Sequence, residues 1–201
     1  DEVYDKTLKM LIGATKKIKI GLPNLLSTDI GPVIDQEAKD RINNHVKSFK
    51  SKVLSQSPLE SKYQGYYVTP TIIEIESLNE VKEEIFGPVI HVYKYKSNEI
   101  EKLISDINKM NYGLTLGIQS RIENTINYIF NNASVGNIYI NRNIVGAVVG
   151  VQPFGGRGLS GTGPKAGGPN YLLKFANEKS YSYNTTAAGG NATLFMMSEN
   201  Q

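Results

Sequence analysis

The chain has 201 residues, of which 40% are hydrophobic and 20% are charged, and its formal net charge is +3. These values are ordinary for a globular protein of one domain or slightly more, and the scattered lysines form no basic stripe for nucleic acid. No apolar run approaches the roughly 18 residues of a membrane span, and the absence of cysteine excludes disulfides, thiolate metal sites and a cysteine nucleophile within these residues.

The first half of the chain contains two helical patterns and one strand pattern. Apolar residues recur at helical spacing over residues 2–19 and again over about 35–53. Residues 66–75 are rich in β-branched and aromatic side chains, although Pro70 favours an edge or irregular strand. Ser77–Glu80 has the spacing of a capping box and predicts the start of a short helix.

Strands and helices then alternate as far as residue 141. The patterns predict strands over residues 88–95, 114–119 and 136–141, separated by helices over 98–110 and 122–131. Such alternation implies right-handed crossovers and a mostly parallel sheet flanked by helices. The predicted fold class is therefore α/β.

The chain changes character near its end, so we expect one domain over residues 1–176 and a separate strand and tail over 177–201. Residues 171–176 are compatible with a helical turn. Residues 179–187 alternate in polarity and predict a strand outside the main sheet. An isolated strand is marginal, so we expect it to pair with another element or subunit.

The beginning of the chain carries no targeting pattern. Asp1 stands directly inside a helical pattern without an initiator Met, which predicts that the chain is part of a longer protein. No signal-peptide pattern opens it, and we expect a cytoplasmic location.

The most informative stretch runs from Val145 to Gly168 and holds nine of the 19 glycines. Glycine adopts positive φ and lets another molecule approach the backbone closely. Flexible linkers are polar and Ser-rich, whereas this stretch contains several valines and Phe154, which favour burial. Because it follows a predicted strand, where binding loops of α/β folds lie, we predict an ordered site loop.

Within this stretch, Gly156–Gly161 matches the letters of the dinucleotide fingerprint G-x-G-x-x-G. That fingerprint requires a strand before it and a helix opening after it. Residues 162–169 are rich in glycine and proline and cannot continue a helix. We therefore reject the match.

His45 and His91 are the only histidines, one in a predicted helix and one in a predicted strand. They show no ligand spacing, so we expect structural roles for both and no metal site.

An acidic pair, an aromatic residue and Gly-Pro follow one another at Glu83–Pro88. This pattern predicts the end of a short helix and a sharp bend into a strand, from which Glu84 and Phe86 project to one side. A carboxylate beside a flat apolar face suits a ribose hydroxyl and a planar ring. On spacing alone, a solvated Glu84 and a core Phe86 at a turn are equally compatible.

The glycine-rich stretch Val145–Gly168 and the segment Glu83–Pro88 together resemble the aldehyde dehydrogenase superfamily. Glu83–Val89 is similar to its Glu-x-Phe-Gly-Pro motif, and lesser landmarks follow the same order at Gly31–Pro32, Tyr67–Thr71 and Asn111–Leu114. Within the superfamily, residues 139–169 and 185–194 closely resemble the L-glutamate γ-semialdehyde (1-pyrroline-5-carboxylate) dehydrogenase module of bacterial proline utilization A proteins. The resemblance covers essentially the whole chain.

The resemblance implies an enzyme that uses NAD to oxidise L-glutamate γ-semialdehyde to L-glutamate in proline catabolism. It assigns Glu84 to the nicotinamide ribose and Phe86 to the nicotinamide. It assigns the backbone N–H groups of Gly146 and Ala147 to the substrate's α-carboxylate, since paired amides bind anions. Phe154 packs against the aliphatic chain in this assignment. The final strand matches an oligomerisation element, so a homo-oligomer is expected.

The chain departs from the family in one large respect, because the family's nucleophile is a cysteine thiolate and this chain has no cysteine. The resemblance places that cysteine shortly before Asp1 and the Rossmann-type cofactor domain further upstream. The chain then supplies one wall of the substrate tunnel and the far edge of the NAD site, with no catalytic residue. We expect it to be inactive without an upstream segment.

Two alternatives stay open. One is a related aldehyde dehydrogenase with another substrate, which the Gly146–Ala147 loop disfavours. The other is a non-catalytic split-gene product or remnant that acts in assembly. An in-frame cysteine and cofactor domain upstream would favour the enzyme.

Overall fold

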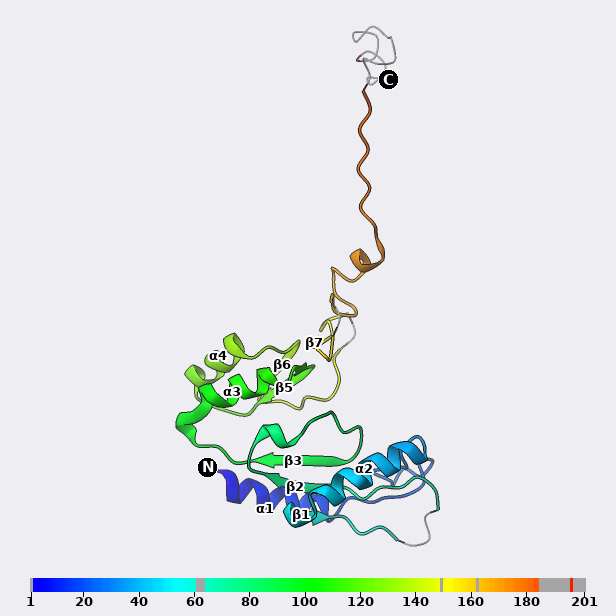
Figure 1. The fold of residues 1–201 in the computed structure, drawn as a ribbon, viewed down its shortest axis with the longest axis vertical. Helices are drawn as coiled ribbons and strands as arrows, with labels where there is room; N and C mark the ends of the chain where they lie inside the picture. Colours follow the sequence, from blue (N-terminus) through cyan, green and yellow to red (C-terminus); the bar gives the residue numbers. More distant parts are fainter. Residues whose placement is uncertain (1, 61–63, 149, 162, 185–195, 197–201) are drawn as a thin grey trace.

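The computed structural model describes residues 2–60, 64–148, 150–161, 163–184 and 196. In this part of the chain, helices and short strands alternate and form two stacked layers, and the C-terminal segment runs away from both (Figure 1). The α/β fold class predicted from the sequence is confirmed.

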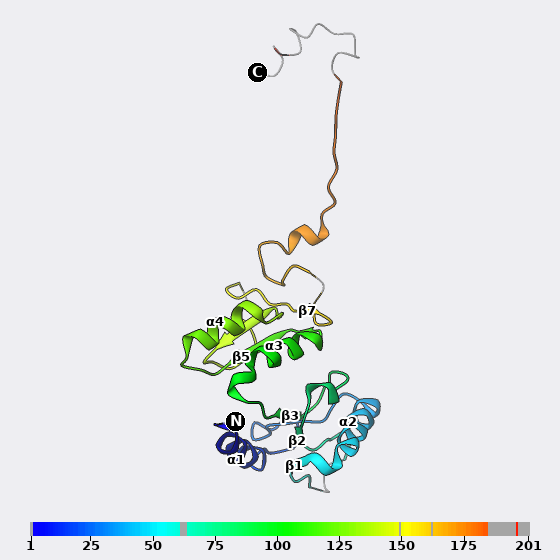
Figure 2. The ribbon, with the colours of Figure 1, turned by 60° about the vertical axis from the view of Figure 1, so that its left-hand side comes forward.

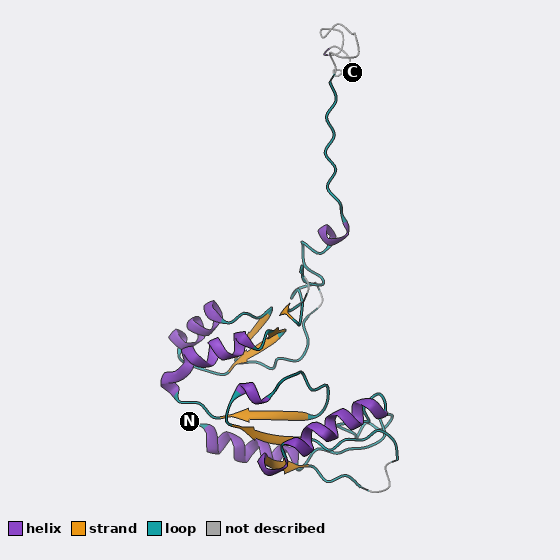
Figure 3. Cartoon of the chain, in the orientation of Figure 1, coloured by secondary structure: helices purple, strands orange, loops and turns teal. Residues whose placement is uncertain are grey.

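Within these ranges, Figure 3 separates the helices from the strands. The α-helices are α1 (Tyr4–Thr15), α2 (Gln36–Ser48), α3 (Ile100–Lys109) and α4 (Glu123–Asn132). Single 3₁₀ turns form η1 (Lys50–Lys52), η2 (Leu78–Glu80), η3 (Ser97–Glu99) and η4 (Leu172–Phe175). The strands are β1 (Val53–Gln56), β2 (Thr71–Ile75), β3 (Val89–Tyr93), β4 (Tyr112–Gly113), β5 (Thr115–Ile118), β6 (Asn137–Ile140) and β7 (Arg157–Gly158).

The first layer contains a three-stranded sheet in the order β1-β2-β3. β2 and β3 are parallel, and Ile73 on β2, which is fully buried, pairs with His91 on β3. Glu74 points to the opposite face because side chains alternate along a strand, and it accepts a hydrogen bond from the Tyr4 hydroxyl of α1. His91 contacts His45 of α2. The two helices therefore cover opposite faces of the sheet.

The second layer packs α3 and α4 against the parallel pair β5–β6. Ile104, Ile118 and Ile129 form its buried core. Partly buried apolar residues surround this core: Ile100, Ile107, Leu116, Ile126, Tyr128, Ala133 and Ile138. The two amphipathic helices bury their apolar faces against a short sheet. This packing explains why helical and strand patterns alternate in this part of the sequence.

The sheet differs from the expectation of one mostly parallel sheet. The strand pairs β2–β3 and β5–β6 are parallel, as predicted, but they belong to separate sheets. β4 and β7 form a further, antiparallel pair. β1 was not predicted: the helix expected to reach residue 53 ends at Ser48, and Val53 begins a strand antiparallel to β2. The strand expected over 66–75 starts only at Thr71, directly after Pro70.

Side-chain hydrogen bonds mark the starts of α2 and η2. The N-cap Asp35 accepts a hydrogen bond from the Ala38 N–H at 2.8 Å and starts α2. Ser77 and Glu80 form the predicted capping box, in which the Glu80 carboxylate accepts from the Ser77 N–H at 3.0 Å. None of the described helices combines the length and apolar composition needed to cross a bilayer.

The C-terminal segment after η4 is extended, and its described residues lie away from both layers (Figure 2). Residues 179–184 are exposed and belong to no sheet in this single chain, and residues 185–187 lie outside the described ranges. A strand requires a neighbouring strand, so pairing of this segment with another subunit stays a prediction.

We expect the isolated chain to self-associate, because large apolar side chains near its end are exposed: Leu172, Leu173, Phe175, Tyr181 and Tyr183. Light scattering should detect species larger than a monomer, and deletion of residues 177–201 should reduce them. A stable monomer at all concentrations would contradict this expectation.

Candidate functional site

The turn between η2 and β3 carries Glu84 and Phe86, and both side chains are exposed. Phe86 is 68% exposed, so it is not a core residue. The preceding helix ends at Glu80, earlier than the acidic pair, and residues 81–88 form an irregular bend. The structure therefore places a carboxylate and an uncovered aromatic ring on one short segment.

Backbone hydrogen bonds fix this turn to the sheet. The Gly87 N–H donates to the Ile85 carbonyl at 2.9 Å, and the Val89 N–H donates to the Gly87 carbonyl at 2.8 Å. The Pro88 carbonyl accepts from the Thr71 N–H at 2.9 Å, which ties the turn to the start of β2. The turn is thus a direct extension of the β2–β3 pair.

Gly87 packs closely against α2. A Cβ at Gly87 would overlap Cδ1 of Ile42 and lie 3.0 Å from its Cγ1. Ile42 is 1% exposed and has little room to move. The glycine thus brings the Glu84–Gly87 turn into close contact with α2.

The glycine-rich loop begins directly after β6. Asn141 has φ +53, and its side-chain amide donates to the Ser120 carbonyl at 2.9 Å while its Oδ1 accepts from the Ser120 N–H at 3.0 Å. Ile144 packs against Gly117, where an added Cβ would lie 2.6 Å from Ile144 Cγ2. The Tyr139 hydroxyl donates to the Gly146 carbonyl at 3.4 Å. These contacts hold the start of the loop against β5 and β6.

Gly146 is exposed and has φ +72, and Ala147 beside it is half-buried. Neither of their backbone N–H groups donates to an acceptor among the described residues. The neighbouring Val148 N–H donates to the Gln152 Oε1 at 3.2 Å, and the Val148 carbonyl accepts from the Gln152 N–H at 2.8 Å. Two adjacent backbone N–H groups that donate to no acceptor among the described residues therefore lie next to the turn closed by Val148 and Gln152.

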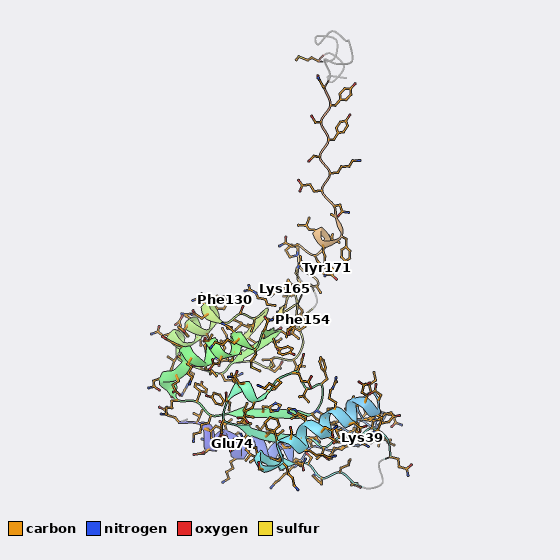
Figure 4. All side chains as sticks on the ribbon, viewed as in Figure 1. Lys39, Glu74, Phe130, Phe154, Lys165 and Tyr171 are labelled. Carbon is orange, nitrogen blue, oxygen red and sulfur yellow. The ribbon has the colours of Figure 1, made fainter. Side chains whose placement is uncertain are left out.

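Phe154 is half-buried and is held by its backbone. It forms an antiparallel bridge with Ala166, in which each N–H donates to the other's carbonyl at 3.0 Å. The side chain of Asn137, at the start of β6, donates to the Pro153 carbonyl at 3.0 Å and accepts from the Gly155 N–H at 3.3 Å. The Lys165 ammonium donates to the Gly136 carbonyl. Figure 4 shows Phe154 and Lys165 close together at the edge of the second layer.

The candidate residues thus form two groups, each within one segment. Glu84 and Phe86 share the turn before β3 in the first layer, whereas Gly146, Ala147 and Phe154 share the loop after β6 in the second layer. Asn137 and Lys165, whose hydrogen bonds hold the backbone around Phe154, were not predicted from the sequence. An asparagine inside a strand was the available signal, since asparagine is depleted in strands.

The two histidines, which the sequence analysis treated separately, are in contact. His45 Nε2 lies 2.8 Å from His91 Nε2, and Phe49 packs against both rings. Partial burial lowers the pKa of each histidine. Among the residues that the structure describes, no three His, Cys, Asp or Glu side chains cluster as a metal site would require.

Comparison with known proteins gives a consistent set of relatives. The sequence model of the aldehyde dehydrogenase family matches residues 1–181 of this chain. The bifunctional protein PutA of Escherichia coli is 52% identical over 182 residues, which are 87% of this chain and 14% of that protein. The 1-pyrroline-5-carboxylate dehydrogenase of a Geobacillus strain is 37% identical over 185 residues, which are 90% of this chain and 36% of that protein.

The solved structures agree with these relatives. A crystal structure of proline utilization A from Bradyrhizobium japonicum matches with a TM-score of 0.85 and 46% identity, over 94% of this chain and 19% of that chain. The chain therefore spans only a small part of the length of the relatives that it matches.

We expect Gly87→Ala to destabilise the chain by about 1–3 kcal/mol, because the new methyl group overlaps Ile42. Ile42→Val removes the overlapping Cδ1, so the double variant should recover part of the loss in urea unfolding. If the losses in unfolding free energy of Gly87→Ala and Ile42→Val simply add in the double variant, this contact does not set the position of the turn.

Proposed function

Because the chain belongs to the aldehyde dehydrogenase family, we propose that it is part of an NAD-dependent enzyme that oxidises L-glutamate γ-semialdehyde to L-glutamate in proline catabolism. Two kinds of relative support this substrate: bifunctional PutA proteins and 1-pyrroline-5-carboxylate dehydrogenases, at 52% and 37% identity. Open-chain semialdehyde forms from 1-pyrroline-5-carboxylate and carries a carboxylate, a short aliphatic chain and an aldehyde.

The observation that carries the substrate assignment is the pair of adjacent N–H groups at Gly146 and Ala147, which have no acceptor within the described chain. Adjacent backbone amides form a concave donor pair that favours an anion such as a carboxylate. Phe154, held on the same loop, offers an apolar surface to the methylene groups. Together these groups bind and orient the substrate at the end remote from the aldehyde.

The Glu84–Gly87 turn is proposed to contact the cofactor. Phe86 fits a planar ring because its own ring is 68% exposed, and Glu84 fits the ribose because a carboxylate accepts hydrogen bonds from two hydroxyls. NAD, when bound, accepts the hydride that leaves the substrate carbon. The turn holds the nicotinamide end of NAD in place for that transfer.

The nucleophile and most of the cofactor site come from another segment in this proposal, because the chain contains no cysteine. That other segment lies upstream, binds NAD and carries the nucleophile.

We further propose that residues 177–201 form the oligomerisation strand and tail of a homo-oligomer, in which the exposed Tyr181 and Tyr183 contact another subunit.

We expect the purified 201-residue chain to reduce no NAD in the presence of the semialdehyde, because loss of a covalent nucleophile costs many orders of magnitude in rate. A chimera in which this chain replaces the matching segment of Escherichia coli PutA should be active, since the remaining segment restores the nucleophile. Reduction of NAD by the isolated chain above a protein-free control would contradict the first expectation. An inactive but folded chimera would contradict the proposed function.

Ala147→Pro in the same chimera should lower kcat/KM for the semialdehyde about ten- to a hundredfold. Proline removes the Ala147 N–H, and a hydrogen bond to a charged group contributes about 1.5–3 kcal/mol. An uncharged aldehyde of similar length should lose much less activity, because it does not use that donor. Equal losses for the two substrates would show that the loop does not anchor a carboxylate.

A further inference from the structure

Both histidines of the chain meet across two elements, although they are 46 positions apart. His45 lies near the end of α2 and His91 in the middle of β3, and their Nε2 atoms are 2.8 Å apart. The rings stand edge to face, with centroids 5.0 Å apart. The proposed function so far uses neither residue.

A distance of 2.8 Å between two imidazole nitrogens fits an N–H···N hydrogen bond. One ring donates its Nε2–H and the other accepts through an unprotonated Nε2, so the bond needs at least one neutral histidine. When both rings are protonated, two N–H donors and two positive charges face each other. The contact therefore exists only while one ring stays neutral.

The surroundings of the histidine pair favour the neutral state. Burial is the largest cause that lowers the pKa of both His45 and His91, and the positive charge of His45 further lowers the pKa of His91. The carboxylate of Glu83 acts in the opposite direction on His45. Phe49 covers both rings, and the register partner of His91 on β2 is the apolar Ile73.

The histidine pair lies beside the turn proposed to contact NAD. Ile42 precedes His45 by three positions on α2, so both side chains lie on one helix face. Ile42 packs against Gly87, and His45 bonds His91 four positions further along the same segment. α2 therefore holds residues 87–91 at two points, one apolar and one polar.

We propose that the His45–His91 hydrogen bond positions the Glu84–Gly87 turn for the nicotinamide riboside of NAD. His45 and His91 are thus positioning residues for the cofactor, which they do not touch. This inference rests on the proposed function, because it takes Glu84 and Phe86 as cofactor contacts.

The sign of the pH dependence follows from the lowered pKa values. The bond is intact above the ordinary histidine pKa of about 6.5, because at least one ring is then neutral. It breaks at a lower pH, where both rings become protonated. Loss of the bond frees one attachment of the turn. The KM for NAD should rise as the pH falls, while kcat at saturating NAD changes less, since binding rather than chemistry is weakened.

The first test uses NMR on the 201-residue chain, in which His45 and His91 are the only histidines. The Phe86 ring signals should shift as the pH falls below about 6.5, together with the ring signals of the histidine that becomes protonated second. The double variant His45→Gln with His91→Gln keeps a neutral hydrogen-bonding pair, so its Phe86 signals should not shift. Asn44→Ala, an exposed neighbour on α2, is the matched control and should behave as the unchanged chain.

The second test uses the PutA chimera. His91→Leu should raise the KM for NAD about two- to tenfold at neutral pH, the range expected for one lost hydrogen bond. The double glutamine variant should keep the original KM and lose its rise in acid.

Phe86 signals that shift identically in the double glutamine variant would overturn the inference. A KM that His91→Leu leaves unchanged, in a folded chimera, would also overturn it. If the chimera shows no dehydrogenase activity, the proposed function fails, and the Phe86 signals alone decide whether the histidine pair positions the turn.

Discussion

Backbone segments approach one another around Gly136, Gly156 and Gly161 more closely than any side chain allows. A Cβ at Gly136 would overlap the Gly155 carbonyl oxygen, and a Cβ at Gly161 would overlap the Gly156 carbonyl oxygen. Only glycine permits this approach, so these residues let the chain fold back against the start of β6. The Phe154–Ala166 bridge and the Asn137 amide contacts form on that folded-back segment. Part of the proposed substrate loop is therefore held by close contacts to other backbone atoms, at Gly156, Gly158 and Gly161.

The two proposed binding segments have independent supports. The cofactor turn is held by β2, β3 and α2, through the Pro88 carbonyl, Ile42 and the histidine pair. The substrate loop is held by β5 and β6, through Ile144, Tyr139 and Asn137. Distant and independent sites usually contribute additively to stability. A substitution that loosens one segment should therefore leave the other in place.

Periodicity predicted α1 to α4, although α1 and α2 end earlier than expected, and the Ser77–Glu80 spacing predicted the capping box, because both signals depend on residues close in sequence. The parallel pairs followed from the alternation of helices and strands. β1 escaped prediction because Val53 follows α2 after only the η1 turn, and its strand character comes from pairing with β2. The exposure of Phe86 was undecided, since spacing does not show whether a turn faces the core. The His45–His91 contact and the Lys165–Gly136 contact join residues far apart in sequence, and no local pattern indicates either of them.

Amide hydrogen exchange in a Gly136→Ala variant tests most directly whether close backbone contact creates the substrate loop. In the unchanged chain, the N–H groups of Phe154 and Ala166 should exchange slowly, because each is hydrogen-bonded to the other residue's carbonyl. In the variant, both should lose protection while the buried Ile73 in β2 keeps it. Unchanged protection at Phe154 and Ala166 would contradict the account, because the loop would then be ordered without the glycine contact.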